Sequence, residues 1–224
     1  MARRTPMQRF ARWHIWLGWL AAIPLILWTL SGLFMTLRPI EDVRGEQLRR
    51  PAALIPTANL TAPRLPGPVK RLTLTEQKGA AVWVVTDNAG NQARYAADGM
   101  PIPPVGEAEA RELARATFAG DAALVSLQRF GADAAPLDLR RERPSWQAAF
   151  ADGTHVYIDA DTGEVLALRS KWWRAYDFMW GLHIMDPLGR ENASHPLLWL
   201  FSVIALVSSV LGTTLLFRRR RTAR

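Results

Sequence analysis

Four histidines carry the candidate chemistry of this 224-residue chain: His14, His155, His183 and His195. A neutral imidazole can ligate a metal ion through either of its ring nitrogens. The chain has no cysteine, which excludes disulfides, thiolate zinc sites, iron–sulfur clusters and covalently attached c-type haem. Neither a G-x-G-x-x-G nor a P-loop pattern is present, so the sequence predicts no nucleotide site of its own.

The surroundings of these histidines differ. His14 lies at the edge of an apolar run, where an ionisable side chain is costly unless it has a function or lies at the membrane interface. His183 lies in an aromatic-rich segment, where an interfacial role is the alternative to metal ligation. His195 precedes Pro196, where a helix cap or a surface position is the alternative. His155 alternates with Tyr157 on a predicted strand, and we expect it on a solvated face.

Two apolar runs place the ends of the chain in a membrane. Residues 13–37 and 196–217 contain no Asp, Glu, Lys or Arg. Each run reaches the roughly 20 residues that a helix needs to cross a bilayer. The first is too long for the apolar core of a signal peptide and no A-x-A-like site follows it, so we expect an uncleaved anchor.

The positive charge is concentrated at the two ends. Residues 1–12 hold four arginines, residues 218–224 hold five, and neither stretch holds an acidic residue. Because the net charge is +8, the residues between them sum to −1, which argues against a nucleic-acid partner. Basic residues beside membrane spans predict that both termini are cytoplasmic and that the central domain lies on the other side, the periplasm.

The central residues predict antiparallel strands and one helix. Alternating patterns and turn residues predict strands, which are Arg71–Glu76, Ala80–Thr86, Asn91–Ala96, Leu124–Phe130, Ser145–Phe150, His155–Asp159 and Val165–Leu168. Residues 107–118 predict an amphipathic helix. A faint repeat, with Trp83 and Tyr95 in one copy and Trp146 and Tyr157 in the other, indicates two related β units flanking this helix.

Several segments resemble the PepSY domain and its associated transmembrane family. They cover most of the chain outside the Pro-rich linker, and they are Thr154–Leu166 in the last hairpin, Arg12–Gly18 and Ser31–Leu33 in the first span, and Leu182–His183 with Leu211–Arg218 around the second. The resemblance implies an α+β membrane protein with two transmembrane helices flanking a periplasmic PepSY-like domain of antiparallel strands with one helix.

The expected order of segments follows from these patterns. It is a cytoplasmic basic tail (1–12), transmembrane helix 1 (13–37), a Pro-rich linker (38–69), the periplasmic PepSY-like domain (70–170), an aromatic interfacial segment (171–195), transmembrane helix 2 (196–217) and a second cytoplasmic basic tail (218–224). The expected location is a bacterial inner membrane.

The resemblance also implies a cofactor, because larger family members include haem-containing reductases linked to iron–siderophore uptake, in which histidines of the spans hold haem b. Here it implies His14 and His183 as ligands of the haem iron and His195 as a further candidate. Gly18 and Gly32, on the same helix face as His14, would leave room for a flat macrocycle. His14 and His183 are predicted near opposite membrane faces, about 30 Å apart, so they cannot share one iron. Near the outer face His183 could pair with His195, but His14 has no partner in its own chain, so we expect a homodimer or a larger membrane complex.

Three functions therefore stay open for this membrane protein. The first is a b-haem electron-transfer component that supports ferric-siderophore or iron reduction, an oxidoreductase component supplied by a quinol or a separate reductase. The second is a cofactor-free, membrane-anchored PepSY module that binds or inhibits another protein. The third is an accessory subunit whose spans dock onto a larger transport or reductase complex.

Overall fold

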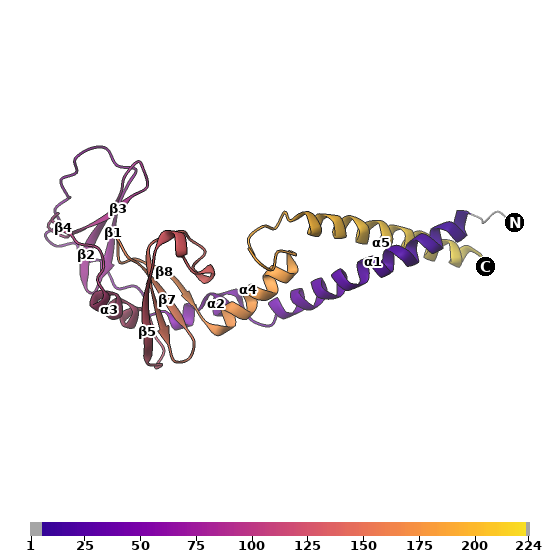
Figure 1. The fold of residues 1–224 in the computed structure, drawn as a ribbon, viewed down its shortest axis with the longest axis horizontal. Coiled ribbons are helices and arrows are strands. Elements are labelled where there is room, and N and C mark those ends of the chain that lie inside the picture. Colours follow the sequence, from indigo (N-terminus) through magenta and orange to yellow (C-terminus); the bar gives the residue numbers. More distant parts are fainter. Residues whose placement is uncertain (1–5, 223–224) are drawn as a thin grey trace. The chain divides into compact units, whose positions relative to one another are not determined.

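The computed structural model describes residues 6–222, with side chains as far as residue 217, and divides them into two compact units (Figure 1). One unit comprises the described residues as far as Pro39 and from Ala175 onward, and the other comprises Ile40–Arg174. Arg3, Arg4 and Arg224 of the predicted basic tails lie outside the described residues.

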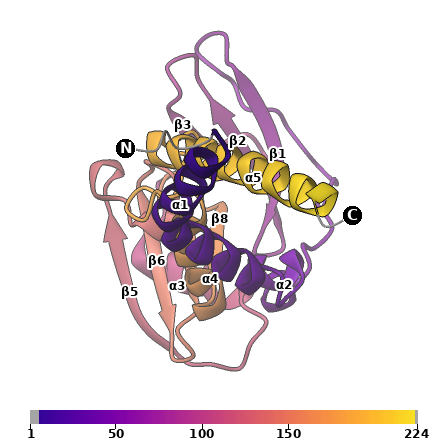
Figure 2. The ribbon, with the colours of Figure 1, turned by 90° about the vertical axis from the view of Figure 1, so that its right-hand side faces the viewer.

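The first unit is built on two long helices, α1 (Pro6–Met35) and α5 (Pro196–Thr222). They lie side by side (Figures 1 and 2) and run antiparallel, since His14 of α1 meets Ser208 in the middle of α5, whereas Trp28, farther along α1, lies beside Leu198 near the start of α5. The α1 helix continues through Pro24 and begins before the predicted residue 13, because proline is favoured in a first helical turn and Arg9 and Arg12 are compatible with helix. The helix ends at Met35, two residues before the predicted end at residue 37.

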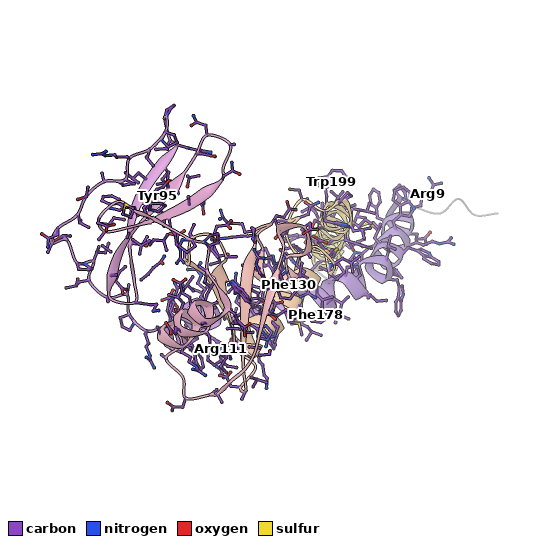
Figure 3. All side chains as sticks on the ribbon, turned by 60° about the vertical axis from the view of Figure 1, so that its left-hand side comes forward. Arg9, Tyr95, Arg111, Phe130, Phe178 and Trp199 are labelled. Atoms are coloured by element: carbon purple, nitrogen blue, oxygen red, sulfur yellow. The ribbon has the colours of Figure 1, made fainter. Side chains whose placement is uncertain are left out.

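The surfaces of α1 and α5 are apolar and exposed. Trp16 and Trp19 of α1 are 67% and 75% exposed, and Trp199 of α5 (Figure 3) is 70% exposed. Both helices are long and apolar enough to cross a bilayer, over Pro6–Met35 and Pro196–Phe217. Indole rings exposed to this extent would be unfavourable in water and are expected against lipid.

The second unit contains two antiparallel sheets, each a simple meander. The strands of the first sheet are β1 (Arg71–Gln77), β2 (Ala80–Thr86), β3 (Gln92–Ala96) and β4 (Pro101–Ile102). The strands of the second are β5 (Leu124–Phe130), β6 (Ser145–Phe150), β7 (His155–Asp159) and β8 (Val165–Arg169). The predicted α+β class and the predicted pair of β units are therefore confirmed.

The two β units differ in register. In the first sheet Trp83 lies directly opposite Tyr95. In the second, Tyr157 lies opposite Gln147, the residue after Trp146. Because side chains alternate between the two faces of a strand, the Trp and Tyr rings share one face in the first sheet and lie on opposite faces in the second.

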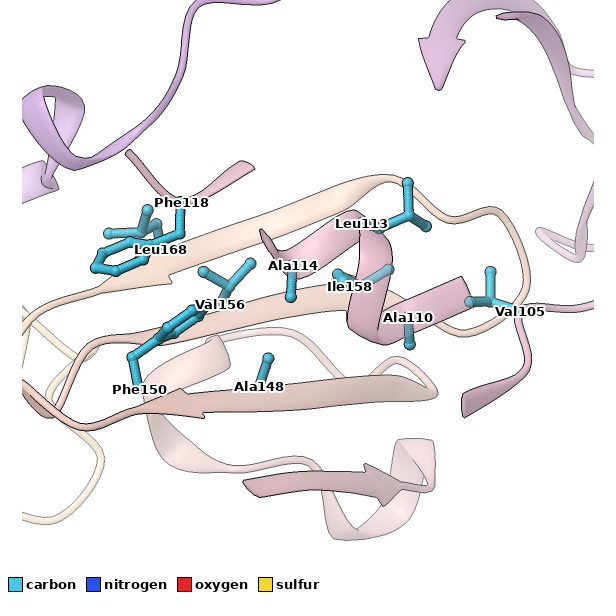
Figure 4. Close-up of a cluster of buried hydrophobic side chains, with 10 residues drawn as sticks. All are labelled: Val105, Ala110, Leu113, Ala114, Phe118, Ala148, Phe150, Val156, Ile158 and Leu168. Carbon is cyan, nitrogen blue, oxygen red and sulfur yellow. The ribbon is translucent and has the colours of Figure 1, made fainter. Parts of the chain in front are cut away.

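Helix α3 (Glu107–Thr117) provides the core of the second unit. Its apolar face packs on β6 and β7 (Figure 4). Buried side chains at this contact are Val105, Ala110, Leu113, Ala114, Phe118, Ala148, Phe150, Val156, Ile158 and Leu168. The helix therefore covers one face of the second sheet.

An ion pair between a buried arginine and a partly exposed glutamate joins α3 to the first sheet. The Arg94 side chain of β3 is 2% exposed, and its guanidinium donates to both carboxylate oxygens of Glu109, at 2.7 and 2.6 Å. Nearby, the Gln77 amide donates to the carbonyl of Thr162 at 2.7 Å. Gly163, at φ +76°, leaves room here, because an added Cβ would lie 2.9 Å from the Gln77 side-chain oxygen. Polar side chains thus link the two sheets.

The remaining elements are short. The segment predicted as a linker begins with α2 (Ile40–Arg44) and a 3-10 turn at Glu46–Leu48, and its Pro-rich part has no regular element before β1. Two more 3-10 turns, Ala132–Ala134 and Leu137–Leu139, lie between β5 and β6. The aromatic segment after β8 forms α4 (Lys171–His183), whose residues from Ala175 onward belong to the first unit.

Candidate functional site

His14 is held against α5 by hydrogen bonding and close packing. Its Nδ1 lies 2.9 Å from the carbonyl oxygen of Ser208 and 3.3 Å from the Ser208 hydroxyl. The ring lies over Gly212, where an added Cβ would be 2.8 Å from His14 Cε1. A carbonyl oxygen only accepts, so the Nδ1 of a neutral ring donates and Nε2 keeps its lone pair.

His183 is held in the same way at the other end of α1. Its Nδ1 lies 3.1 Å from the Ser31 hydroxyl and 3.2 Å from the carbonyl oxygen of Trp28. The Ser31 hydroxyl itself donates to the Trp28 carbonyl at 3.0 Å, so its oxygen is available to accept from His183. Gly32 again provides the space, with an added Cβ 3.3 Å from His183 Cε1. In a neutral His183 the proton is therefore also on Nδ1, and Nε2 carries the lone pair.

Two indoles stack on the His183 ring. The Trp28 ring stacks on the imidazole with a centroid distance of 5.2 Å, and the Trp180 ring does so at 6.5 Å. Their planes lie within 24° and 21° of the imidazole plane. Stacking together with a two-acceptor hydrogen bond fixes the orientation of the ring.

His14 and His183 cannot approach one another within a chain. His14 occupies position 14 of α1, whereas His183 contacts α1 at Trp28, Ser31 and Gly32. At 1.5 Å per residue this separation is about 25 Å. Among the described residues no cluster of three or more His, Cys, Asp and Glu side chains could hold a metal ion.

His195 has a different role in the loop before α5. The Leu197 N–H donates to His195 Nδ1 at 3.4 Å, so this nitrogen is an acceptor and caps the first turn of α5. A neutral His195 then has its proton on Nε2, the reverse of His14 and His183. This geometry separates His195 from the other two candidates.

The loop between α4 and α5 is fixed by charged groups. Arg190 donates to the buried Asp177 carboxylate at 2.9 Å. Asp186 accepts the backbone N–H groups of Asn192, Gly189 and Glu191, and these hydrogen bonds, chiefly that of Asn192, lower the pKa of the Asp186 carboxyl. The segment that follows His183 is therefore held in one conformation.

The predicted solvated face of β7 is wrong. Tyr157, on the same face as His155, is fully buried because Ala135 and Leu139 pack against it. Asp159, on that face too, is fully buried and pairs with Arg143. Burial also raises the pKa of Tyr157 to about 12. His155 remains partly exposed, 3.7 Å from the Asp138 carboxylate, and this close approach of His155 is the main cause that lowers the pKa of that carboxyl.

The small residues of the two spans are used unequally. The sequence predicts close approach of another group at Gly18, but an added Cβ there would meet nothing within 4 Å. On the same helix it is Ala21 that is buried. On α5 the small pair Ser208 and Gly212 contacts His14. The serine partners were missed because spacing within one helix predicts close approach but does not predict which side chain approaches.

A hollow between α1 and α5 lies beside Trp28. It has a volume of about 140 Å³ and is lined by Pro24, Leu25, Trp28, Met185, Leu198, Phe201, Ser202 and Ala205. Ligand pockets commonly measure roughly 300–1,000 Å³. This hollow is therefore too small for a whole haem.

Comparison with known proteins gives one family. The family described as the PepSY-associated TM region matches residues 11–224, which include both spans, both sheets and all four histidines. No curated protein and no solved structure matches the chain. With two apolar helices that flank antiparallel sheets, the chain is a membrane protein that belongs to the PepSY-associated TM region family.

Proposed function

We propose that this protein is a membrane-bound b-haem electron-transfer component, with His14 and His183 as its axial iron ligands. The observation that carries the proposal is that both imidazoles are held by the same kind of hydrogen bond. Each donates from Nδ1 to a backbone carbonyl of α1 or α5 and keeps a lone pair on Nε2. Metal-bound histidines commonly have this arrangement, since the second nitrogen fixes the tautomer and orients the ring.

The residues fit haem as ligand donors, provided that two copies combine. In one chain the hydrogen-bonded imidazoles of His14 and His183 lie about 25 Å apart along α1. Ligation of one haem iron by two histidines needs both imidazoles at the same depth in the membrane. A symmetric dimer would bring two copies of His14 together, and two copies of His183. The open surface at Gly18, one turn from His14, supports the approach of a second chain.

A bound haem b would supply a one-electron centre at each level. The chain itself would hold the imidazoles in one tautomer and exclude water with its apolar helices. With the termini in the cytoplasm of a bacterial cell and the β unit in the periplasm, electrons from a quinol or a separate reductase would serve ferric-siderophore or iron reduction. The arginine-rich ends support this orientation.

A second function is favoured by the same hydrogen bonds. Because His14 and His183 already join separate helices through Ser208 and Ser31, they have a structural use without a cofactor. The protein would then be a cofactor-free anchored PepSY module, or an accessory subunit of a larger transport or reductase complex. In that case replacing either histidine would weaken helix association and leave no optical change.

Absorbance spectroscopy tests the proposal. We expect the protein, purified in mild detergent after expression with added haem, to show the sharp reduced α-band of haem b on addition of dithionite. His14→Ala and His183→Ala should each remove part of this band, because each deletes a different ligand pair. His155→Ala is the matched control and should retain it. A spectrum without haem bands would leave the cofactor-free function.

Gly18→Leu tests the paired arrangement. Since an added Cβ meets nothing within its own chain, the variant should fold normally. The larger side chain should keep a second chain away and remove the haem at His14, while the haem at His183 is retained. Haem content per chain and the mass of the detergent complex measure the outcome. Val207→Leu, at an exposed position of α5, is the control, and full haem content in Gly18→Leu would contradict this pairing.

A further inference from the structure

The hydroxyls beside the two histidines are buried within the helical unit. Ser31 is 1% exposed and Ser208 is 7% exposed. Their oxygens lie 3.1 Å from His183 Nδ1 and 3.3 Å from His14 Nδ1. At this burial, little water can replace a lost serine oxygen as an acceptor.

We propose that Ser31 and Ser208 are positioning residues that set the electron-donating strength of His183 and His14 through Nδ1. The part of this inference that concerns iron rests on the proposed function, whereas the part that concerns hydrogen bonding does not. In each case the serine oxygen adds a second acceptor to a backbone carbonyl, so that Nδ1–H is shared between two oxygens. Neither serine touches iron; each acts through its histidine.

The sign of the effect follows from the direction of the hydrogen bond. An acceptor at Nδ1–H gives the imidazole more anionic character and makes it a stronger donor at Nε2. A stronger donor stabilises ferric over ferrous iron and lowers the reduction potential. Removing the serine oxygen should therefore raise the potential of the haem held by that histidine.

The two serines should contribute unequally. At His183 the serine oxygen, at 3.1 Å, is nearer than the carbonyl, at 3.2 Å. At His14 the carbonyl dominates at 2.9 Å and the serine oxygen is farther away, at 3.3 Å. Hydrogen bonds weaken with distance, so the larger change should follow the loss of Ser31.

The test compares Ser31→Ala and Ser208→Ala with Ser209→Ala in the full chain. Ser209 is a matched control because its hydroxyl donates to the Ala205 carbonyl of its own helix. The first readout is the Nδ1–H proton resonance of ¹⁵N-histidine-labelled, cofactor-free protein, recorded at about pH 8.5, above the ordinary histidine pKa of about 6.5. The second is the midpoint potential of the haem-loaded protein.

We expect Ser31→Ala to move the His183 resonance upfield and the midpoint potential upward, and Ser208→Ala to do the same at His14 by less. Ser31→Thr, which keeps the hydroxyl, should restore both values. If Ser31→Ala matches Ser209→Ala in both readouts, the inference is overturned. If no haem binds, the proposed function fails by itself, and the Nδ1–H resonance still decides whether the serines act on the histidines.

Discussion

Glu109→Gln is expected to lower the free energy of unfolding of the β unit by roughly 3 kcal/mol, because it leaves the Arg94 charge buried and unpaired. Arg94 is 2% exposed, and both of its hydrogen bonds to Glu109 are charge-assisted. Hydrogen exchange of the β2 and β3 amides in the full chain measures the loss. Amides that exchange through opening of the unit should exchange about a hundredfold faster.

The matched control for this variant is Glu107→Gln in the same helix turn. Glu107 pairs with Arg111 at an exposed position and should contribute less than about 1 kcal/mol. Equal effects of the two variants would contradict the importance of the buried pair.

Lowering the pH gives an independent test of the contribution of the Arg94–Glu109 ion pair. The hydrogen bond from Arg94 is the main cause that lowers the pKa of Glu109 in the folded protein. The ion pair therefore stabilises the fold fully above the unfolded-state pKa of about 4.3, and this contribution is lost as the pH falls through the lower folded pKa. The exchange rates of the wild type and Glu109→Gln should converge over that interval.

Gly212→Leu is expected to destabilise the helix pair by roughly 1–3 kcal/mol through overpacking. The first added carbon would already lie 2.8 Å from His14 Cε1, so the imidazole must leave its place beside Ser208. Far-UV circular dichroism during SDS titration in mixed micelles should show a lower midpoint. In haem-loaded protein the fraction of the α-band assigned to His14 should also disappear.

Val207→Leu is the control for helix pairing, since it places a leucine at an exposed position of the same helix. Its SDS midpoint should equal that of the wild type. A Gly212→Leu protein with an unchanged midpoint would show that the contact of His14 with α5 does not stabilise the pair.

Local patterns predicted the elements because local forces determine them. The alternation in β1, the apolar run of β2 and the acidic first turn of α3 each reflect one strand or one helix. The family resemblance was confirmed over residues 11–224. The predicted haem ligands, His14, His183 and His195, and the predicted boundaries of the domains remain predictions.

The contacts of the histidines depend on residues far away in the sequence. His14 and Ser208 are separated by 194 positions, and Ser31 and His183 by 152. No periodicity within one segment reports such a pairing. The error at Tyr157 has the same origin, because Ala135 and Leu139 cover a face that the strand pattern alone marks as exposed.

The offset between the two β units limits how this domain can have diverged. From tryptophan to tyrosine the first copy spans one residue more than the second, and the extra residue lies between the turn and the tyrosine, because the two turns have equal lengths. If both descend from one duplicated ancestor, a single insertion or deletion exchanged the inner and outer faces of a strand. Equivalent positions after the turn then face opposite sides of their sheets, so exchanging these strands between the two copies would turn their side chains to the wrong face.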